Sequence, residues 1–452
     1  SLVTQDENLQ LQPLLATSWE TEDSLVWVFH LRTDVTFSDG EPLTAADVVF
    51  TYETMTDPDF NSPYRSLVNP IVAIEALDDY TVQMTLEQPY APLFSYLDTG
   101  IVPEHIAATN PEQLYANPVG SGPYTLANWD KGSIINLVAR EDYWGGAPNL
   151  NIDIVIVPDP TARAQALEAG DIDLVMSPLA PQDVVRLGRD PNIAGFELAG
   201  LGVTYLNFNV QDPILSDVRV RQAISMLVDA ETIGGFIYQG MDTPATSMLL
   251  PNWPAYTDAV AQPTFTIEGA KALLAVAGWA DTNNDGVLDK DGQDLSFVLS
   301  THSEDPNRVQ AVEYLQYLFS EVGIDCTANI SDWPSFFATV LAGEHDIALL
   351  GWLNLNDPDR MFHRTLHSAG ANNWAKYSNA AYDAAVDTGR TVLDEAARTE
   401  AYQTAAEIVA TELPYYIILY QGYQVYFTPK LIGYAPHVRG LMRNLMTCTL
   451  ED

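Results

Sequence analysis

The chain has 452 residues, of which 61 are acidic and 20 basic, so its formal net charge is −41. This length predicts two or three domains, and the few basic residues exclude a surface that neutralises nucleic-acid phosphates or anionic lipid headgroups. A hydrophobic fraction of 47% predicts well-packed domains, and no apolar run approaches the roughly 18 residues of a membrane-spanning helix.

Two further features bear on the cellular compartment. The chain begins with Ser1 and Leu2, which is typical neither of a signal peptide nor of an initiator methionine. We therefore expect a processed secreted protein or a cloning boundary. Cys326 and Cys448 are too few for a disulfide framework. They could form one bridge, and two unpaired buried thiols are an equal alternative.

Residues 18–147 show strands, one clear helix and several turns. Residues 26–31 and 81–86 alternate apolar and other side chains with a period of two, which predicts strands. Between them, Thr44 and Asp47 have the spacing of a capping box, in which both side chains satisfy free amides at a helix start. A helix is therefore expected to begin at this point.

After Pro148 the pattern changes to alternating strands and helices. Strands are expected at 152–156 and 172–176, with a helix at 162–169 between them, and this order predicts parallel strands in one sheet. A strand and a helix follow at 203–209 and 217–228.

A second α/β segment begins near residue 265. Its expected helices and strands are 266–277, 295–299, 307–320, 324–330, 334–341 and 347–350. Two α/β domains that face one another are therefore predicted, with a ligand beyond the carboxyl ends of their strands.

Searches for catalytic motifs find almost nothing. The sequence has no nucleophile elbow, no HExxH motif and no phosphate-binding glycine loop. His363 and His367 are four residues apart and could share a helix face around a metal, or lie at a solvated helix end. We therefore expect a protein that is not an enzyme and has no catalytic cofactor. A secreted glycoside hydrolase, which needs a carboxylate pair in a cleft, is the alternative from another class.

One loop has the spacing of a calcium site. Oxygen ligands stand at loop positions 1, 3, 5, 7 and 9, which are Asp281, Asn283, Asp285, Val287 through its carbonyl, and Asp289. Position 12 is Gly292 and not a bidentate glutamate, so Asp291 or Asp294 would have to substitute. The alternatives are a structural calcium ion and a polar turn that needs no ion.

Several motifs occur in an order that points to a known family. They include PVGSGPY at 118–124, DYWGG at 142–146, GDID at 170–173, DVRVRQAI at 217–224, GW at 351–352 and DPD at 357–359. Together with residues 11–55, these stretches closely resemble the family 5 extracellular solute-binding proteins. Members of this family are dipeptide-, oligopeptide- and nickel-binding receptors of ABC importers. The resemblance covers nearly the whole chain.

The resemblance implies an α/β fold of the periplasmic-binding-protein flytrap kind (type II, cluster C), with two α/β lobes and an extra domain. Residues 18–147 would form the additional domain, residues 251–420 would form lobe II, and lobe I would combine 1–17, 148–250 and 421–452. Hinge closure would enclose the ligand, and an ABC permease in the membrane would recognise the closed form. A monomer in the periplasm or outside the cell is implied, free or tethered by a lipid on its precursor.

The ligand implied by the family is an oligopeptide. Peptide-binding members place an aspartate shortly after Gly-Trp, where it pairs with the peptide's α-amine, and the matching residue here is Leu355. A leucine cannot neutralise an ammonium, and burial of that charge without a partner would cost several kcal/mol. This departure disfavours a free-amine peptide and raises a neutral oligosaccharide as the alternative.

Aromatic and amide side chains near the expected strand ends could contact such a ligand. Trp352 follows the strand at 347–350, where a residue of the cleft is expected, although packing in the core is an equal alternative. Asn207 and Asn209 could instead satisfy backbone groups near a hinge. The predicted contacts are Ser121, Tyr205, Asn207, Asn209, Trp352, Asn354, Leu355 and Trp374.

Overall fold

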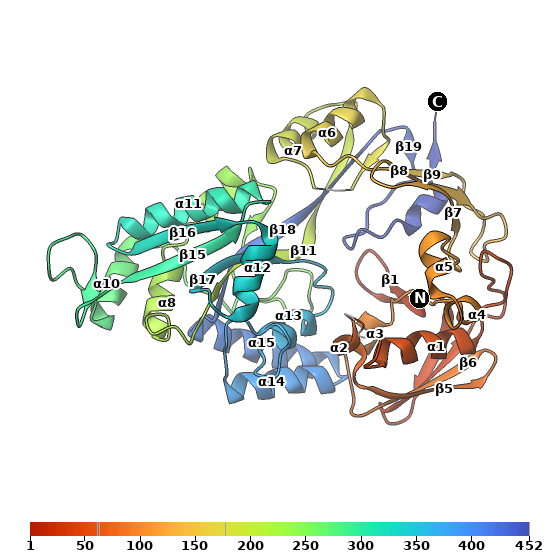
Figure 1. The fold of residues 1–452 in the computed structure, drawn as a ribbon, viewed down its shortest axis with the longest axis horizontal. Helices are drawn as coiled ribbons and strands as arrows, with labels where there is room; N and C mark the ends of the chain where they lie inside the picture. Colours follow the sequence, from red (N-terminus) through yellow and green to blue (C-terminus); the bar gives the residue numbers. More distant parts are fainter. Residues whose placement is uncertain (61, 63, 177, 452) are drawn as a thin grey trace. The chain divides into compact units, whose positions relative to one another are not determined.

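The computed structural model describes residues 1–60, 62, 64–176 and 178–451, which form two units (Figure 1). Unit 1 holds residues 1–196, 391–393 and 424–452, and unit 2 holds residues 197–390 and 394–423. The chain enters unit 2 within strand β11 (Ala194–Phe208) and leaves it within β18 (Tyr415–Phe427). Residues 197–250 thus belong to unit 2, although the sequence grouped them with 148–196. The division into two lobes and an additional domain stays a prediction.

Unit 1 contains two antiparallel sheets. The first has the strand order β3-β4-β6-β5 and the second the order β7-β8-β9. Their bounds are β3 (Ala16–Thr21), β4 (Val26–Leu31), β5 (Ile71–Asp78), β6 (Thr81–Leu86), β7 (Tyr124–Asp130), β8 (Ile134–Ala139) and β9 (Ile152–Val155). Alternate residues of β4 and β6 are buried, which confirms the predicted period of two.

The predicted capping box begins helix α1 (Ala45–Thr56). The Thr44 amide donates to the Asp47 carboxylate at 2.8 Å, and the helix buries Val48 and Tyr52 against the first sheet. The other helices of unit 1 are α2 (Arg65–Val68), α3 (Leu93–Tyr96), α4 (Glu104–Ala107), α5 (Pro111–Ala116), α6 (Pro160–Ala169), α7 (Pro181–Leu187) and a 3₁₀ helix at Arg443–Thr447. Two short ribbons, β1 (Val3–Gln5) with β2 (Leu11–Pro13) and β19 (Leu431–Ile432) with β20 (Thr449–Leu450), complete it.

The strand–helix–strand prediction for 152–176 is wrong in its pairing. Helix α6 forms and ends at Gly170, whose φ of 76° is left-handed, as the sequence predicts. However, β9 pairs with β8, whereas β10 (Leu174–Val175) pairs antiparallel with β18 in another sheet. The two strands on either side of the helix therefore do not share a sheet, because each pairs with a different strand.

A larger sheet has the order β10-β18-β11-β17-β15-β16, and β12 (Thr243–Pro244) pairs with β18. Its strands β12, β15, β16 and β17 belong to unit 2, whereas β10 belongs to unit 1. β15 (Ser296–His302) runs parallel to β16 (Asp325–Ser331) and to β17 (Ile347–Trp352), which confirms the parallel α/β pattern predicted for this segment. β11 runs antiparallel to β17. Helix α11 (Pro306–Ser320) connects β15 to β16 and packs against both (Figure 1).

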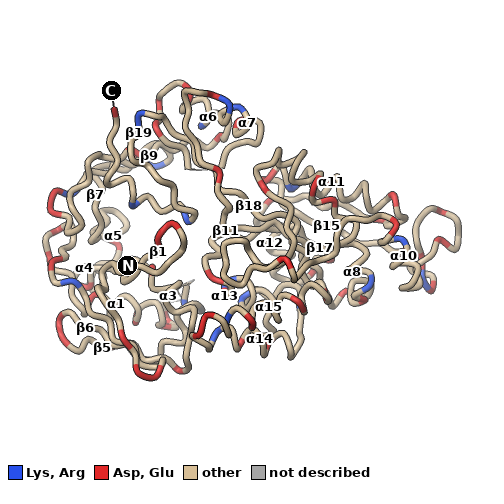
Figure 2. Tube along the Cα trace, turned by 180° about the vertical axis from the view of Figure 1, so that it is seen from behind, with Lys and Arg blue, Asp and Glu red and all other residues tan. Residues whose placement is uncertain are grey.

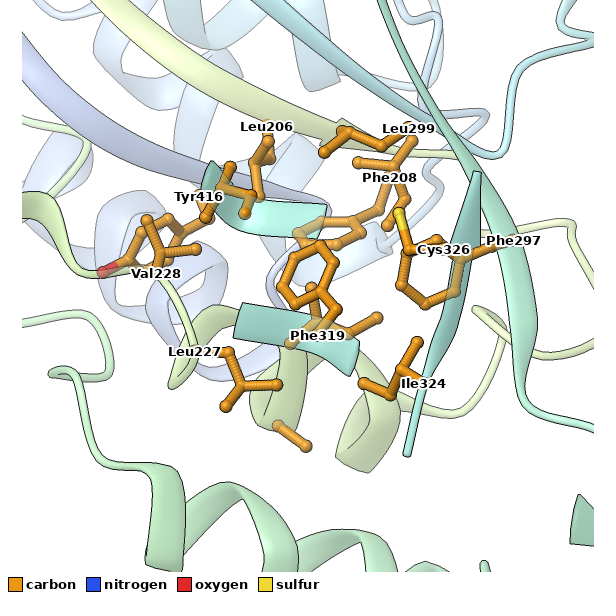
Figure 3. Packing of buried hydrophobic residues seen from close by; sticks show 14 of the residues in the cluster. Leu206, Phe208, Leu227, Val228, Phe297, Leu299, Phe319, Ile324, Cys326 and Tyr416 are labelled. Atoms are coloured by element: carbon orange, nitrogen blue, oxygen red, sulfur yellow. The ribbon is translucent and has the colours of Figure 1, made fainter. Parts of the chain in front are cut away.

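This sheet is buried on both faces. On one face, Phe208 of β11 and Phe297 of β15 pack with Phe319 of α11 and the thiol of Cys326 (Figure 3). On the other face, Tyr205 and Leu350 pack in a second core with α12 (Trp333–Ala342) and α13 (Asp359–Leu366). This packing explains why residues 197–250 belong to unit 2, because β11 lies inside its two cores.

The remaining elements surround these cores. They are α8 (Val218–Ser225), α9 (Ala230–Thr232), a π-helical turn at Ile233–Ile237, α10 (Ile267–Ala277), β13 (Asp289–Lys290), β14 (Gln293–Asp294), α14 (Ala380–Thr391) and α15 (Glu395–Glu412). Cys326 and Cys448 are buried free thiols, so the unpaired alternative is confirmed. Acidic residues are spread over both units and basic ones are sparse (Figure 2). Within the described residues, no helix combines the length and apolar character that crossing a membrane requires.

A single arginine holds several loops of unit 1. The Arg140 side chain is 5% exposed and donates to the carbonyls of Thr36, Phe37 and Gly122 at 3.2–3.3 Å. It also pairs with Asp142, whose oxygen lies 2.9 Å from its Nη2 atom. Each buried carbonyl that loses such a donor costs free energy, since water cannot replace it.

We therefore expect Arg140→Met to lower the free energy of unfolding by about 2–4 kcal/mol, because buried carbonyls are left without donors. Urea unfolding followed by fluorescence measures this change. Asp34→Asn is the control in the same unit, because it breaks the ion pair of Arg32 with a side chain that is 57% exposed. The role of Arg140 is contradicted if both variants unfold at the same urea concentration.

Candidate functional site

Three parallel strands of unit 2 end together at one edge of the sheet. Because β15 is parallel to β16 and to β17, their carboxyl ends at His302, Ser331 and Trp352 lie at the same edge. The Ser303 amide donates to the Ser331 carbonyl at 2.8 Å and joins two of these ends. We call residues 302–308, 331–337 and 352–354 the carboxyl edge. Ligands of parallel α/β sheets bind beyond such strand ends, so this edge is the candidate site.

A row of four aromatic rings lies at the carboxyl edge. Trp333 stacks on Phe337 with ring centroids 4.9 Å apart, and Phe337 meets Trp374 edge-on at 5.3 Å. Trp374 stacks in turn on Trp352 at 5.4 Å. Trp333 is 41% exposed and Trp352 is partly exposed, whereas Trp374 is buried. The row thus presents a rigid apolar surface, of the kind that dominates binding energies.

Charged groups at the same edge fix one another. Glu304 accepts the Trp333 amide at 2.9 Å, and this hydrogen bond lowers the pKa of the carboxyl. His302 lies 3.1 Å from Glu304 through Nδ1 and 3.0 Å from Nη1 of Arg308 through Nε2. Because a guanidinium can only donate, Nε2 accepts the hydrogen bond from Arg308, and Nδ1 carries the ring proton and donates a hydrogen bond to Glu304. Sequence analysis did not predict this series of hydrogen bonds, since isolated charged residues near a helix start form no recognisable motif.

Two predicted contacts lie inside the core. Tyr205 and Asn207 are 0% exposed, and the ring of Tyr205 stacks on Tyr415 at 4.6 Å. Nδ2 of Asn207 donates to the Tyr415 hydroxyl at 3.4 Å, and Oδ1 of Asn207 lies 3.3 Å from Nε2 of His345. Burial lowers the pKa of His345 to about 4, so its ring is neutral at pH 7. Ligand contact by Tyr205 or Asn207 stays a prediction, and neither side chain is accessible in this structure.

Asn209 lies at the other end of the sheet from the carboxyl edge, and Ser121 belongs to the other unit. The Asn209 amide donates to the carbonyls of Gly343 and His345 at 3.2 and 3.0 Å, and its oxygen accepts the Gln211 amide. This agrees with the alternative in which the asparagine satisfies backbone groups. Ser121 is partly exposed and belongs to unit 1. A ligand contact by either residue stays a prediction.

The loop after Trp352 is divided between solvent and core. Leu353 is 68% exposed, and the exposed Asn354 has a left-handed φ of 56°. Leu355 is 1% exposed, its amide donates to the Leu201 carbonyl at 2.9 Å, and its carbonyl accepts the Trp253 indole at 2.8 Å. The exposed part of this loop therefore offers an apolar side chain and an amide, with no carboxylate.

The Asp-Pro-Asp motif anchors this loop to two helices. Asp357 lies 2.7 Å from Arg398 of α15, and Asp359 lies 2.8 Å from Arg390 of α14. Both carboxylates are buried, and the arginine that pairs with each one compensates its charge. The motif thus positions the strand end at Trp352.

One cluster has the composition of a metal site. Among the described residues, His363, His367 and Asp387 are the three potential ligands whose atoms lie within 4.8 Å of one another. However, Nδ1 of His367 accepts the Ala369 amide at 3.0 Å, so the proton of the neutral ring is on Nε2, 3.4 Å from Asp387. A metal at Nε2 would displace a proton that Nδ1 cannot take. The geometry favours a histidine–aspartate contact over a metal.

The calcium-like loop is held by its own hydrogen bonds. Asp289 accepts the Thr282 hydroxyl at 2.7 Å and its amide at 2.8 Å, which lower the pKa of the carboxyl. Asp281 accepts the Gly286 amide at 3.1 Å, and Asn283 and Asp285 accept the amides two residues further on. The carbonyl of Val287 accepts none of these hydrogen bonds. Calcium binding stays a prediction, and these bonds favour the alternative that needs no ion.

We therefore expect chelation by EDTA to leave the Tm unchanged. Asp289→Ala should lower the Tm with or without calcium, because it removes both Thr282 bonds, and Asp281→Ala should have a smaller effect. Differential scanning fluorimetry in EDTA and in millimolar calcium measures both. A Tm that falls in EDTA, recovers with calcium and loses this response in Asp281→Ala would establish the calcium site.

Comparisons with known proteins agree with this architecture. The dipeptide-binding protein of Escherichia coli (strain K12) is 30% identical over 441 residues, covering 90% of this chain and 80% of its own length. The oligopeptide-binding protein AppA from Bacillus subtilis, solved with a nonapeptide, is 28% identical with a TM-score of 0.84, covering 100% of this chain and 92% of its own.

A third relative binds a different kind of ligand on the same fold. NikA from Brucella suis, solved in complex with Fe(III)-EDTA, is 26% identical with a TM-score of 0.89, covering 100% of this chain and 93% of its own. Residues 10–373 match the pattern of one family over most of the chain. The chain is therefore a mixed α/β solute-binding protein and not an enzyme, and it belongs to family 5 of the bacterial extracellular solute-binding proteins.

Proposed function

We propose that this protein captures a peptide-sized ligand between two lobes and delivers it to the permease of an ABC importer. Family membership supports a receptor of this kind, and the relatives from Escherichia coli and Bacillus subtilis are named for dipeptides and oligopeptides. The observation that carries the proposal is the aromatic row at the carboxyl edge. Trp333 and Trp352 face solvent there in part, at the end of strands where ligands bind in α/β sheets.

The proposed ligand is an oligopeptide, and the exposed residues of the loop after Trp352 support this chemistry. Leu353 and Asn354 are exposed beside Trp352, and they offer apolar contact and amide hydrogen bonds to an extended backbone. A metal chelate is the second candidate, because NikA was solved with Fe(III)-EDTA. The oligosaccharide and glycoside-hydrolase alternatives have no support among these relatives. We further propose a monomer that acts in the periplasm or outside the cell, either free or tethered by a lipid on its precursor.

Trp352→Ala tests the site. We expect di- and tripeptides to raise the Tm of the wild-type protein, because a ligand that binds only the folded state stabilises it. Removal of an aromatic ring at the centre of the contact should weaken binding at least tenfold, or by about 1.4 kcal/mol. Isothermal titration calorimetry of the same peptides measures the loss.

Trp129→Ala is the matched control, since Trp129 is an exposed tryptophan (45%) on β7 of unit 1. It should bind as the wild type does. Cello-, manno- and xylo-oligosaccharides and Fe(III)-EDTA belong in the same screen. Stabilisation by one of these with none by peptides would overturn the peptide proposal, and turnover of a sugar by the purified protein would overturn the receptor itself.

A further inference from the structure

Strand β18 is only loosely buried where the chain passes from unit 2 to unit 1. The residues on either side of this passage are buried, whereas residues 421–424 are partly exposed, and the boundary between the units follows Tyr423. Gly200 of the neighbouring strand β11 leaves no room for a side chain, since a methyl group there would lie 2.5 Å from the Gln421 carbonyl oxygen. Segments with few buried apolar contacts open most readily, so polar contacts set the local stability here.

Two polar contacts within unit 2 hold this segment. Nε2 of Gln421 donates to the Val203 carbonyl of β11 at 3.3 Å. The Gly422 amide donates to a carboxylate oxygen of Asp242 at 3.1 Å, just before the chain enters unit 1. Asp242 is 7% exposed and directly precedes β12, which pairs with β18. A buried acid therefore holds the strand close to its passage between the units.

Little positive charge compensates this buried acid. Burial is the main cause that raises the pKa of Asp242 to about 7, while the Gly422 hydrogen bond lowers it, Asp305 adds to the increase and Arg308 opposes it. The nearby Tyr238 hydroxyl stays neutral, because burial raises its own pKa. The π-helical turn, β12, β18 and the buried part of β11 contain no charged residue or histidine. The proton on Asp242 is therefore controlled mainly by burial of the group.

This burial links opening of the segment to the proton. When residues 421–424 open, water reaches Asp242, and the pKa of its carboxyl returns toward the ordinary value of 3.8. The closed form thus binds the proton more tightly than the open form does, so protonation stabilises the closed form. This stabilisation is complete below about pH 4 and is lost as the pH rises through about 7.

We propose that Asp242 is a proton-controlled latch on β18, in which the protonated carboxyl keeps residues 421–424 closed and ionisation favours their opening. The Gly422 amide has an acceptor in both forms, because a protonated carboxyl retains a carbonyl oxygen. The forms differ in the cost of burial, which is much larger for the charged group. Since β18 runs from one unit into the other, the latch makes the flexibility of this connection depend on pH. It acts whatever ligand the protein binds.

Hydrogen–deuterium exchange of the full chain at pH 6, 7 and 8 tests the latch. Exchange rates of peptic fragments that cover β18 are divided by the intrinsic rates, which gives a protection factor at each pH. In the wild type this factor should fall about tenfold from pH 6 to pH 8, as carboxyl pKa values near 7 and 4 in the closed and open forms require. Asp242→Asn keeps an acceptor for the Gly422 amide and cannot ionise, so its protection factor should not change with pH.

Asp217→Asn is the matched control in unit 2. Asp217 accepts the Arg219 amide at 2.9 Å, and its hydrogen bonds with Arg219 lower the pKa of its carboxyl, so it stays ionised from pH 6 to 8. This variant should keep the wild-type fall in protection. Asp242→Ser is a second neutral variant and should lose that fall, and thermal melts establish that each variant is folded. Constant protection of β18 in the wild type, or an unchanged fall in folded Asp242→Asn and Asp242→Ser, overturns the latch.

Discussion

The burial of one sheet on both faces is the constraint on which unit 2 depends. Leu206 and Phe208 of β11 point into one core, while Val203 and Tyr205 point into the other. No face of the sheet is left for a polar ligand, so only the ends of the strands can present functional groups. This explains why aromatic and charged side chains gather at the carboxyl edge, where the chain leaves the sheet and its side chains reach solvent.

Buried arginines join helices α8 and α15 to the segments that surround this sheet. Arg221 of α8 is 5% exposed and donates to the carbonyls of Leu413 and Leu215 at 3.1 and 2.6 Å, so it satisfies main-chain groups at the end of α15. Near the other end of α15, Arg398 of that helix binds Asp357, which lies shortly after the end of β17. Helix α15 is thus held at both ends, and one of these contacts anchors the loop that follows Trp352.

The sequence predicted elements well where periodicity was local, and less well where partners were distant. The period of two at β4 and the capping box at Thr44 depend on neighbouring residues, and both were confirmed. The predicted pairing of β9 with β10 was wrong, because β9 pairs with the preceding strand β8 and β10 pairs with β18, which lies far along the chain.

The candidate site shows the same difference between local and distant information. Trp352 was placed at a strand end from the local pattern, and the structure puts it there. Tyr205 and Asn207 share a strand face, but no local signal says that a helix layer covers that face. The position of Arg308 at the carboxyl edge could not be predicted, because it lies against Gly351, which is distant in sequence and adjacent in space.

The scarcity of basic residues makes this guanidinium unusual. The chain has only 20 basic residues and a net charge of −41, and one of them is held at the carboxyl edge. The general negative field is screened within roughly 8–10 Å at physiological salt, so the groups that contact this guanidinium at short range determine its local charge balance more than the distant carboxylates do.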